Sequence, residues 1–122
     1  MVEKSCPALV VHAPDDYRKR LITRLDEKHF AVTVATDGDE AIAALAERPF
    51  NVIVLGVSLK NGTGASTLEY LRAHREKIRC GIILLGDPDP ALRTHAPWVD
   101  ETLLKPADVD YVATRARTYC GC

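Results

Sequence analysis

Short runs of apolar residues alternate along this chain with stretches in which apolar residues recur every three or four positions. The runs are typical of strands buried on both faces, and the wider spacing is typical of helices that bury one side. Strands are predicted at the apolar or β-branched residues 8–11, 31–35, 50–55, 81–85 and 101–104. Because helical patterns separate these strands, right-handed βαβ crossovers and a parallel sheet are predicted.

Capping residues and a helix breaker mark the ends of the predicted helices. Asp15 or Asp16 precedes the first helix and Asp108 the last, where a carboxylate can accept hydrogen bonds from the first free amides. The turn at residues 36–39 offers another cap, and Pro49 ends the helix that follows it. The apolar stripes comprise Tyr17, Leu21, Ile22, Leu25, Ala41, Ile42, Leu45, Leu68, Leu71, Val109, Val112, Ala113 and Ala116.

The size of the chain fits one α/β domain. Its 122 residues and 47% hydrophobic content suffice for a single continuous core. In the flavodoxin-like pattern the five-stranded sheet has the order 2-1-3-4-5 and helices on both faces, which makes three layers. We expect one domain over residues 1–122, with its core at about 8–119 and a tail at 120–122. Three prolines fall in the stretch 86–102, so the fourth helix is expected to be short or irregular.

Composition and charge narrow the range of functions. A net charge of −1 gives no global field that would favour nucleic acid or an anionic membrane. No apolar run approaches the roughly 20 residues that span a bilayer, and residues 1–7 lack the apolar stretch of a signal peptide. We therefore expect a cytoplasmic protein with no nucleic-acid or membrane partner. Cys6, Cys80, Cys120 and Cys122 are too few and too irregularly spaced to predict a disulfide framework.

Several signals, spaced from residue 8 to about 119, resemble the receiver domains of response regulators, the CheY-like family. They are the start at 10–11, the run Asp-Gly-Asp-Glu-Ala at 37–41, the apolar strand and loop at 50–64, and Leu-Leu-Lys-Pro at 103–106. Their order and spacing carry the resemblance. It implies a doubly wound sheet and a role in two-component, phosphorelay-like signalling.

The chemistry of that family depends on four kinds of group. The resemblance implies an aspartate nucleophile after the third strand, an acidic pair for Mg²⁺ after the first, a hydroxyl after the fourth and a lysine after the fifth. In the order nucleophile, acidic pair, hydroxyl and lysine, the four positions here hold Gly56, His12 with Ala13, Gly86 and Lys105. The resemblance also implies a switch aromatic shortly before the lysine, and that position holds Thr102. Only the lysine is kept, so no route to ordinary phosphotransfer remains, and we expect neither a metal nor another cofactor.

Two alternative roles stay open for residues near this degenerate pocket. Asp15 and Asp16 follow the acidic-pair positions by three to four residues, where helix capping is favoured over a place in the pocket. His12, Ser58 and Lys105, with the backbone amides of the two pocket glycines, could form a small anion site. Against this, a lone histidine at a strand end is more often a hydrogen-bonded structural residue.

The sequence thus predicts a phosphorylation-independent pseudo-receiver that acts as a protein–protein interaction module in bacterial signalling, motility or transcription control. It does not predict an enzyme, because no nucleophile–base pair or metal cluster can be assembled from adjacent loops. The alternatives are a sensor that binds a small anion or ligand in the emptied pocket, and a redox module that uses Cys120 and Cys122. Trp98 is either a half-buried cover of the core or an anchor for the protein partner. Partner identity, oligomeric state and whether the chain is free-standing or the N-terminal part of a longer protein are not predicted.

Overall fold

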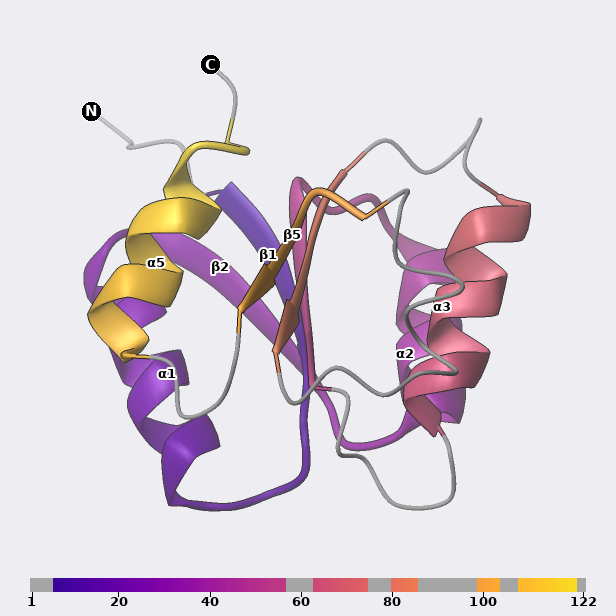
Figure 1. Cartoon of the computed structure of the whole chain (residues 1–122), viewed down its shortest axis with the longest axis horizontal. Helices are drawn as coiled ribbons and strands as arrows, with labels where there is room; N and C mark the ends of the chain where they lie inside the picture. The colour runs from indigo at the N-terminus through magenta and orange to yellow at the C-terminus, as the bar shows by residue number, and fades with distance from the viewer. Residues whose placement is uncertain (1–5, 57–62, 75–79, 86–98, 104–107, 121–122) are drawn as a thin grey trace.

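Five parallel strands form one sheet, and helices cover both of its faces (Figure 1). The computed structural model describes most of the chain, namely residues 6–56, 63–74, 80–85, 99–103 and 108–120, with the backbone alone at 63–66. The strand order 2-1-3-4-5 confirms the predicted flavodoxin-like topology. The expected short or irregular fourth helix falls outside the described residues. Within them, no helix has the length and apolar character that crossing a membrane requires.

The elements lie close to their predicted positions. The strands are β1 Cys6–Val11, β2 Phe30–Ala35, β3 Val52–Gly56, β4 Gly81–Leu85 and β5 Glu101–Leu103. The helices that the structure describes are α1 Asp16–Glu27, α2 Gly38–Glu47, α3 Thr63–Ala73 and α5 Val109–Arg117. Helices α1 and α5 pack on one face of the sheet, and α2 and α3 pack on the other (Figure 1). The third strand begins and ends later than predicted, so Gly56 is its last residue and pairs with Leu85.

Alternate strand residues fill the two layers of the core. Along β1, Leu9 and Val11 lie in the layer under α2 and α3, whereas Ala8 and Val10 lie in the layer under α1 and α5. Every residue of β3 and β4 is buried. Because both faces of the sheet are covered, these strands are apolar throughout rather than at every second position.

Aspartate side chains cap two helices as predicted. The Asp15 carboxylate accepts a hydrogen bond from the Arg18 amide at 2.9 Å at the start of α1, and Asp37 does the same for the Glu40 amide at 2.9 Å at the start of α2. Asp108 is the N-cap residue of α5, but its side chain makes no capping hydrogen bond, contrary to expectation. At that position only the backbone carbonyl takes part in the first helical turn.

A disulfide joins the start of β1 to the turn after α5. Cys6 and Cys120 are 114 residues apart in the sequence, with Cα atoms 5.6 Å apart. The sequence predicted no disulfide framework and gave Cys120 and Cys122 as an alternative redox pair. The structure instead joins Cys120 to Cys6, and Cys122 lies outside the described residues. The reason is topological: α5 runs back against the strand direction, so its end and the start of β1 meet at one edge of the sheet (Figure 1).

The ring of Tyr119 covers this edge beside the disulfide. It lies against Gly81, the first residue of β4, where an added Cβ would come within 2.3 Å of the Tyr119 Cγ atom. The Tyr119 carbonyl also accepts a long contact of 3.5 Å from the Asn51 side-chain amide. Glycine at position 81 is therefore required by the close approach of an aromatic ring.

Gly81→Ala should lower the free energy of unfolding by about 1–3 kcal/mol, the usual range for overpacking a core. The ring cannot retreat without losing the 2.7 Å hydrogen bond from the Tyr119 hydroxyl to Glu101. Urea denaturation followed by circular dichroism measures the change. The matched control is the same substitution in a Tyr119→Ala background, where it should cost less. Equal costs in both backgrounds would show that Tyr119 is not the obstruction.

Candidate functional site

The carboxyl edge of the sheet brings the ends of β1 and β3 together. Val11 pairs with Leu55, so the next residues along the two strands, His12 and Gly56, lie side by side. Ligands of open α/β sheets bind at this edge, near the point where the strand order reverses. The structure thus brings together two of the predicted pocket residues.

His12 fills the space that a side chain at position 56 would need. A Cβ atom built on Gly56 lies 2.8 Å from His12 Cδ2 and 3.4 Å from both Cγ and Nε2. Non-bonded carbon atoms have their optimal contact only from about 3.5 Å, so even an alanine would force the ring to move. His12 is 2% exposed, which leaves the ring no solvent to move into. The pocket is therefore filled at this point rather than emptied.

Neighbours on the loop and on α1 hold the His12 ring. The Nδ1 atom lies 2.9 Å from the Ala13 carbonyl oxygen and 3.6 Å from the Asp15 carboxylate. A carbonyl oxygen only accepts, so Nδ1 carries the proton in this hydrogen bond. The Tyr17 ring tilts against the imidazole, with 5.6 Å between the ring centroids. His12 is thus a buried and hydrogen-bonded residue with a fixed ring orientation.

A second set of hydrogen bonds ties the loop after β1 to the end of β2. The Arg18 Nη1 atom donates to the His12 carbonyl and to the Thr36 hydroxyl, both at 3.2 Å. The Thr36 amide donates to the Glu40 carboxylate at 2.7 Å, and the His12 amide donates to the Ala35 carbonyl at 3.0 Å. The backbone that carries His12 is therefore anchored on both sides.

The remaining predicted site residues are less informative. Ala13 is partly buried against the layer under α2 and α3, and Thr102 is exposed on β5, two strands away from Gly56. Among the described parts of the chain, no three histidine, cysteine or acidic side chains gather as metal ligands. Four of the predicted site residues lie outside the described ranges, namely Ser58, Gly86, Trp98 and Lys105.

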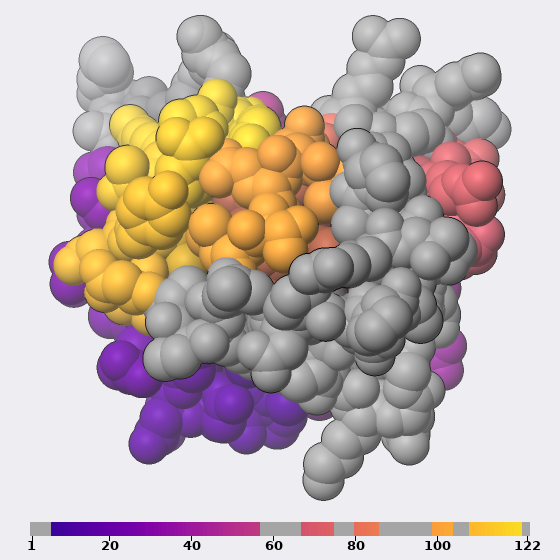
Figure 2. All heavy atoms as spheres, in the orientation of Figure 1, coloured from indigo at the N-terminus to yellow at the C-terminus, as the bar shows by residue number. Residues whose placement is uncertain are grey.

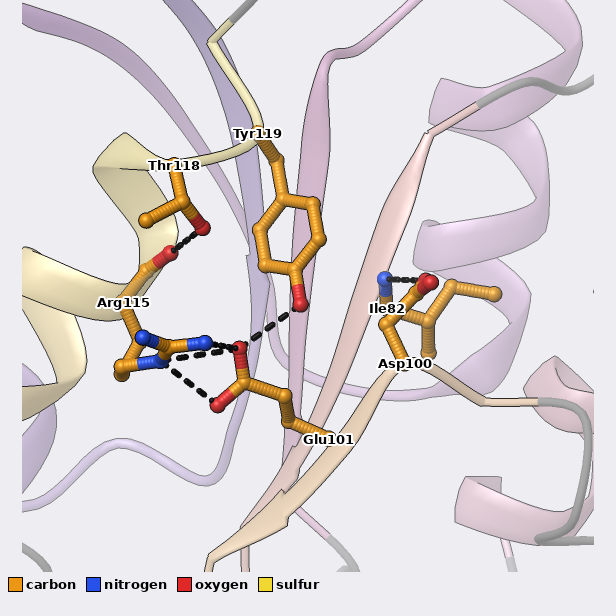
Figure 3. A network of polar contacts seen from close by, with 6 residues as sticks. All are labelled: Ile82, Asp100, Glu101, Arg115, Thr118 and Tyr119. Atoms are coloured by element: carbon orange, nitrogen blue, oxygen red, sulfur yellow. Dashed lines mark hydrogen bonds and ion pairs between the residues drawn. The ribbon is translucent and has the colours of Figure 1, made fainter.

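A polar network, absent from the sequence prediction, joins β5 to α5 (Figure 3). The Glu101 carboxylate accepts hydrogen bonds from Arg115 Nε at 2.8 and 2.9 Å and from Nη2 at 2.7 Å, and the Tyr119 hydroxyl donates to it at 2.7 Å. A bidentate pair of an arginine and a carboxylate fixes the relative orientation of the two side chains as well as their distance. Arg115 and Tyr119 have the four-residue spacing of neighbours on a helix, although Tyr119 lies in the turn after α5. Nothing in the sequence identified their partner. Figure 2 shows α5 and β5 side by side on the molecular surface.

The network shifts the titration of its members. Hydrogen bonds from Arg115 hold the pKa of Glu101 below its ordinary value, and the Tyr119 hydroxyl adds to this effect. Burial, followed by the hydrogen bond to Glu101, raises the pKa of Tyr119 to about 12. The Glu101 carboxylate likewise raises the pKa of Arg115.

The melting temperature should therefore fall at both ends of the pH scale. The Glu101 contribution is complete above the ordinary glutamate pKa of about 4.3 and is lost as pH falls through the lowered folded value. The Tyr119 contribution is complete below the ordinary tyrosine pKa of about 10 and is lost as pH rises through the folded value of about 12. Calorimetric scans across pH measure both effects.

Two variants separate these contributions. Glu101→Gln should flatten the acid side of the profile, and Tyr119→Phe should flatten the alkaline side. Glu47→Gln removes one carboxylate that is 72% exposed and so controls for the change in net charge. An acid limb that is the same in Glu101→Gln as in wild type would contradict the assignment.

Comparison with protein families identifies the same architecture. The model of the response regulator receiver domain matches residues 8–117. The acid tolerance regulatory protein ActR of Sinorhizobium medicae and that of Rhizobium meliloti are each 30% identical to this chain, over 90% of its length. The chain covers 66% of each of these proteins, just under two thirds of their length.

Solved structures extend the likeness over the whole fold. A CheY-like receiver domain protein of Methanospirillum hungatei has a TM-score of 0.83 at 17% identity, with 96% of this chain and 94% of that chain covered. Chemotaxis protein CheY4 of Vibrio cholerae has a TM-score of 0.81 at 21% identity, over 95% and 99% of the two chains. The receiver domain of the Francisella response regulator 1452 has a TM-score of 0.77 at 26% identity, over 95% and 97%.

Proposed function

The chain belongs to the response regulator receiver family, and from this premise we propose that it is a pseudo-receiver, a signalling module that binds a protein partner without being phosphorylated. The observation that carries the proposal is the His12 ring beside Gly56. The family reaction needs a carboxylate at that position. Here the position has no side chain, and the volume that one would occupy is taken by a buried imidazole.

The acidic-pair positions also lack the metal ligands that the reaction needs. Mg²⁺ prefers oxygen ligands in octahedral geometry. At the acidic-pair positions His12 offers a ring nitrogen and Ala13 offers no polar side-chain atom. Without the cation, no metal neutralises the charge of an incoming phosphoryl group. The neighbouring Asp15 carboxylate is engaged as the cap of α1 and lies beside the His12 ring.

The filled pocket also bears on the alternative of an anion sensor. A small anion at the carboxyl edge would need the space next to Gly56 together with Ser58 and Lys105. His12 already occupies that space, and its Nδ1 proton is directed to the Ala13 carbonyl. We therefore favour a module that acts through its outer surface.

The chain should accept no phosphoryl group from acetyl phosphate in the presence of Mg²⁺. Intact-mass spectrometry on freshly treated protein measures this, with a receiver that carries the aspartate as the positive control. Gly56→Asp alone should remain unmodified, because the His12 ring obstructs the new side chain and the acidic pair is still missing. An acid-labile phosphoryl adduct on the wild type would overturn the proposal.

A packing control tests the geometry without any chemistry. Gly56→Ala should lower the free energy of unfolding by about 1–3 kcal/mol, as overpacking does. The loss should shrink in a His12→Ala background, where the ring no longer meets the new Cβ atom. If the two backgrounds give the same loss, His12 does not occupy the position of the missing carboxylate.

Trp98 is our candidate anchor for the protein partner. It lies in the proline-rich stretch outside the described residues, and an aromatic side chain among prolines loses little entropy on binding. Once a partner is isolated, Trp98→Ala should weaken binding by about 2 kcal/mol, as expected for an aromatic hot spot. Isothermal titration calorimetry measures the change, and circular dichroism verifies that the variant is folded.

The matched comparison is a charge reversal on α1. Arg18 and Arg24 there are engaged within the domain, Arg18 with the His12 carbonyl and Arg24 with Asp110 at 2.7 Å. Lys19 lines a shallow groove between α1 and α5 and is exposed. Lys19→Glu should leave binding unchanged. A folded Trp98→Ala that binds normally, together with a Lys19→Glu that does not, would move the surface to α1.

A further inference from the structure

We propose that Cys6 and Cys120 form a reversible thiol–disulfide switch whose state controls the order of the β5–α5 face. This inference is independent of the interaction role proposed above. It rests on the disulfide itself, on the unequal exposure of its two halves and on a chain of contacts that leads from Cys120 to β5.

The two halves of the disulfide lie in different surroundings. Cys6 is the first residue of β1, is 8% exposed and lies in the core layer under α1 and α5. Cys120 lies beyond the end of α5 and is partly exposed. An attacking thiolate must reach a sulfur atom along the line of the S–S bond, so access decides which half reacts. Cys120 is therefore the half that an external thiol reaches.

A dithiol reductant can open the disulfide in two exchange steps. A thiolate of the reductant bonds to the sulfur of Cys120 while the S–S bond breaks and Cys6 leaves as a thiolate. The second thiol of the reductant then displaces Cys120, so the reductant becomes a disulfide and the protein gains two electrons and two protons. The reverse reaction, with a small-molecule disulfide as oxidant, restores the cross-link.

Contacts carry the state of Cys120 to the β5–α5 network. Tyr119, the preceding residue, places its ring on Gly81 and its hydroxyl on Glu101 at 2.7 Å. Glu101 is in turn held by the Arg115 guanidinium (Figure 3). When the cross-link opens, Tyr119 keeps this hydroxyl bond and the 3.5 Å contact from the Asn51 side-chain amide. Reduction of the disulfide should therefore make Tyr119 more mobile and, through Glu101, weaken the packing of β5 against α5.

The position of the cross-link favours a local response to reduction. It ties down the end of the chain, where local opening is least costly. Both core layers contain large aliphatic side chains that are fully buried, and reduction removes none of these side chains. The reduced domain should therefore stay folded while its last turn is released.

A redox titration tests whether the bond is reversible. The purified chain is equilibrated in dithiol and glutathione buffers, free thiols are alkylated, and mass spectrometry counts them. Half-reduction should occur between the potentials of the thioredoxin and glutaredoxin couples. The transition should persist in Cys122→Ser and Cys80→Ser and vanish in Cys6→Ser and Cys120→Ser. Resistance to reduction across this range, or a native link from Cys122, would overturn the switch.

Hydrogen exchange tests the coupling to the β5–α5 face. On reduction, amides in residues 101–103 and 109–120 should exchange several-fold faster, while those of α2 should not change. The melting temperature should fall by about 10 °C, given the large loop that the bond closes. Cys120→Ser should match reduced wild type in either buffer. If that variant fails to fold, reduced wild type decides the question: unchanged exchange in these segments overturns the coupling, and global unfolding overturns the switch.

Discussion

The parallel pairing of β1 with β2 and β3 determines where every other feature of this molecule can lie. Parallel strands all end at one edge of the sheet, and each connecting helix returns the chain to the other edge. The register places His12 beside Gly56 at the carboxyl edge. The same arrangement places the end of α5 beside the start of β1 at the opposite edge, which allows the Cys6–Cys120 bond. Both features follow from strand direction rather than from neighbours in the sequence.

The same kind of packing occurs at both edges of the sheet. At each edge an aromatic ring occupies the volume that a side chain on a strand glycine would fill: His12 at Gly56, and Tyr119 at Gly81. The consequences differ with the place. At the carboxyl edge, in our proposal, the ring lies where an active receiver carries its reactive carboxylate. At the other edge the ring connects β4 to Glu101 on β5 and to the end of α5, so it contributes to how firmly these elements are held together.

The pseudo-receiver that we propose has consequences for signalling. Its pocket would not respond to a phosphoryl group, so any change of state must enter elsewhere. The Glu101–Arg115–Tyr119 network holds β5 against α5 in one arrangement, and the disulfide lies one residue from its Tyr119. The domain thus combines a fixed frame on the α2 and α3 side with a seam on the α5 side that a single covalent bond can tighten or release.

The sequence by itself determined the fold and led to our pseudo-receiver proposal. Continuous apolar runs identified strands buried on both faces, and the proposal began from the glycine that follows the third run, Gly56. Only the tertiary structure decided how these positions are used. That the His12 ring fills the Gly56 site, that Cys6 meets Cys120, and that Glu101 receives Arg115 depend on side-chain directions and on contacts across 14 to 114 residues. Periodicity reports which face of an element is buried, but it carries no information on which distant residue lies opposite.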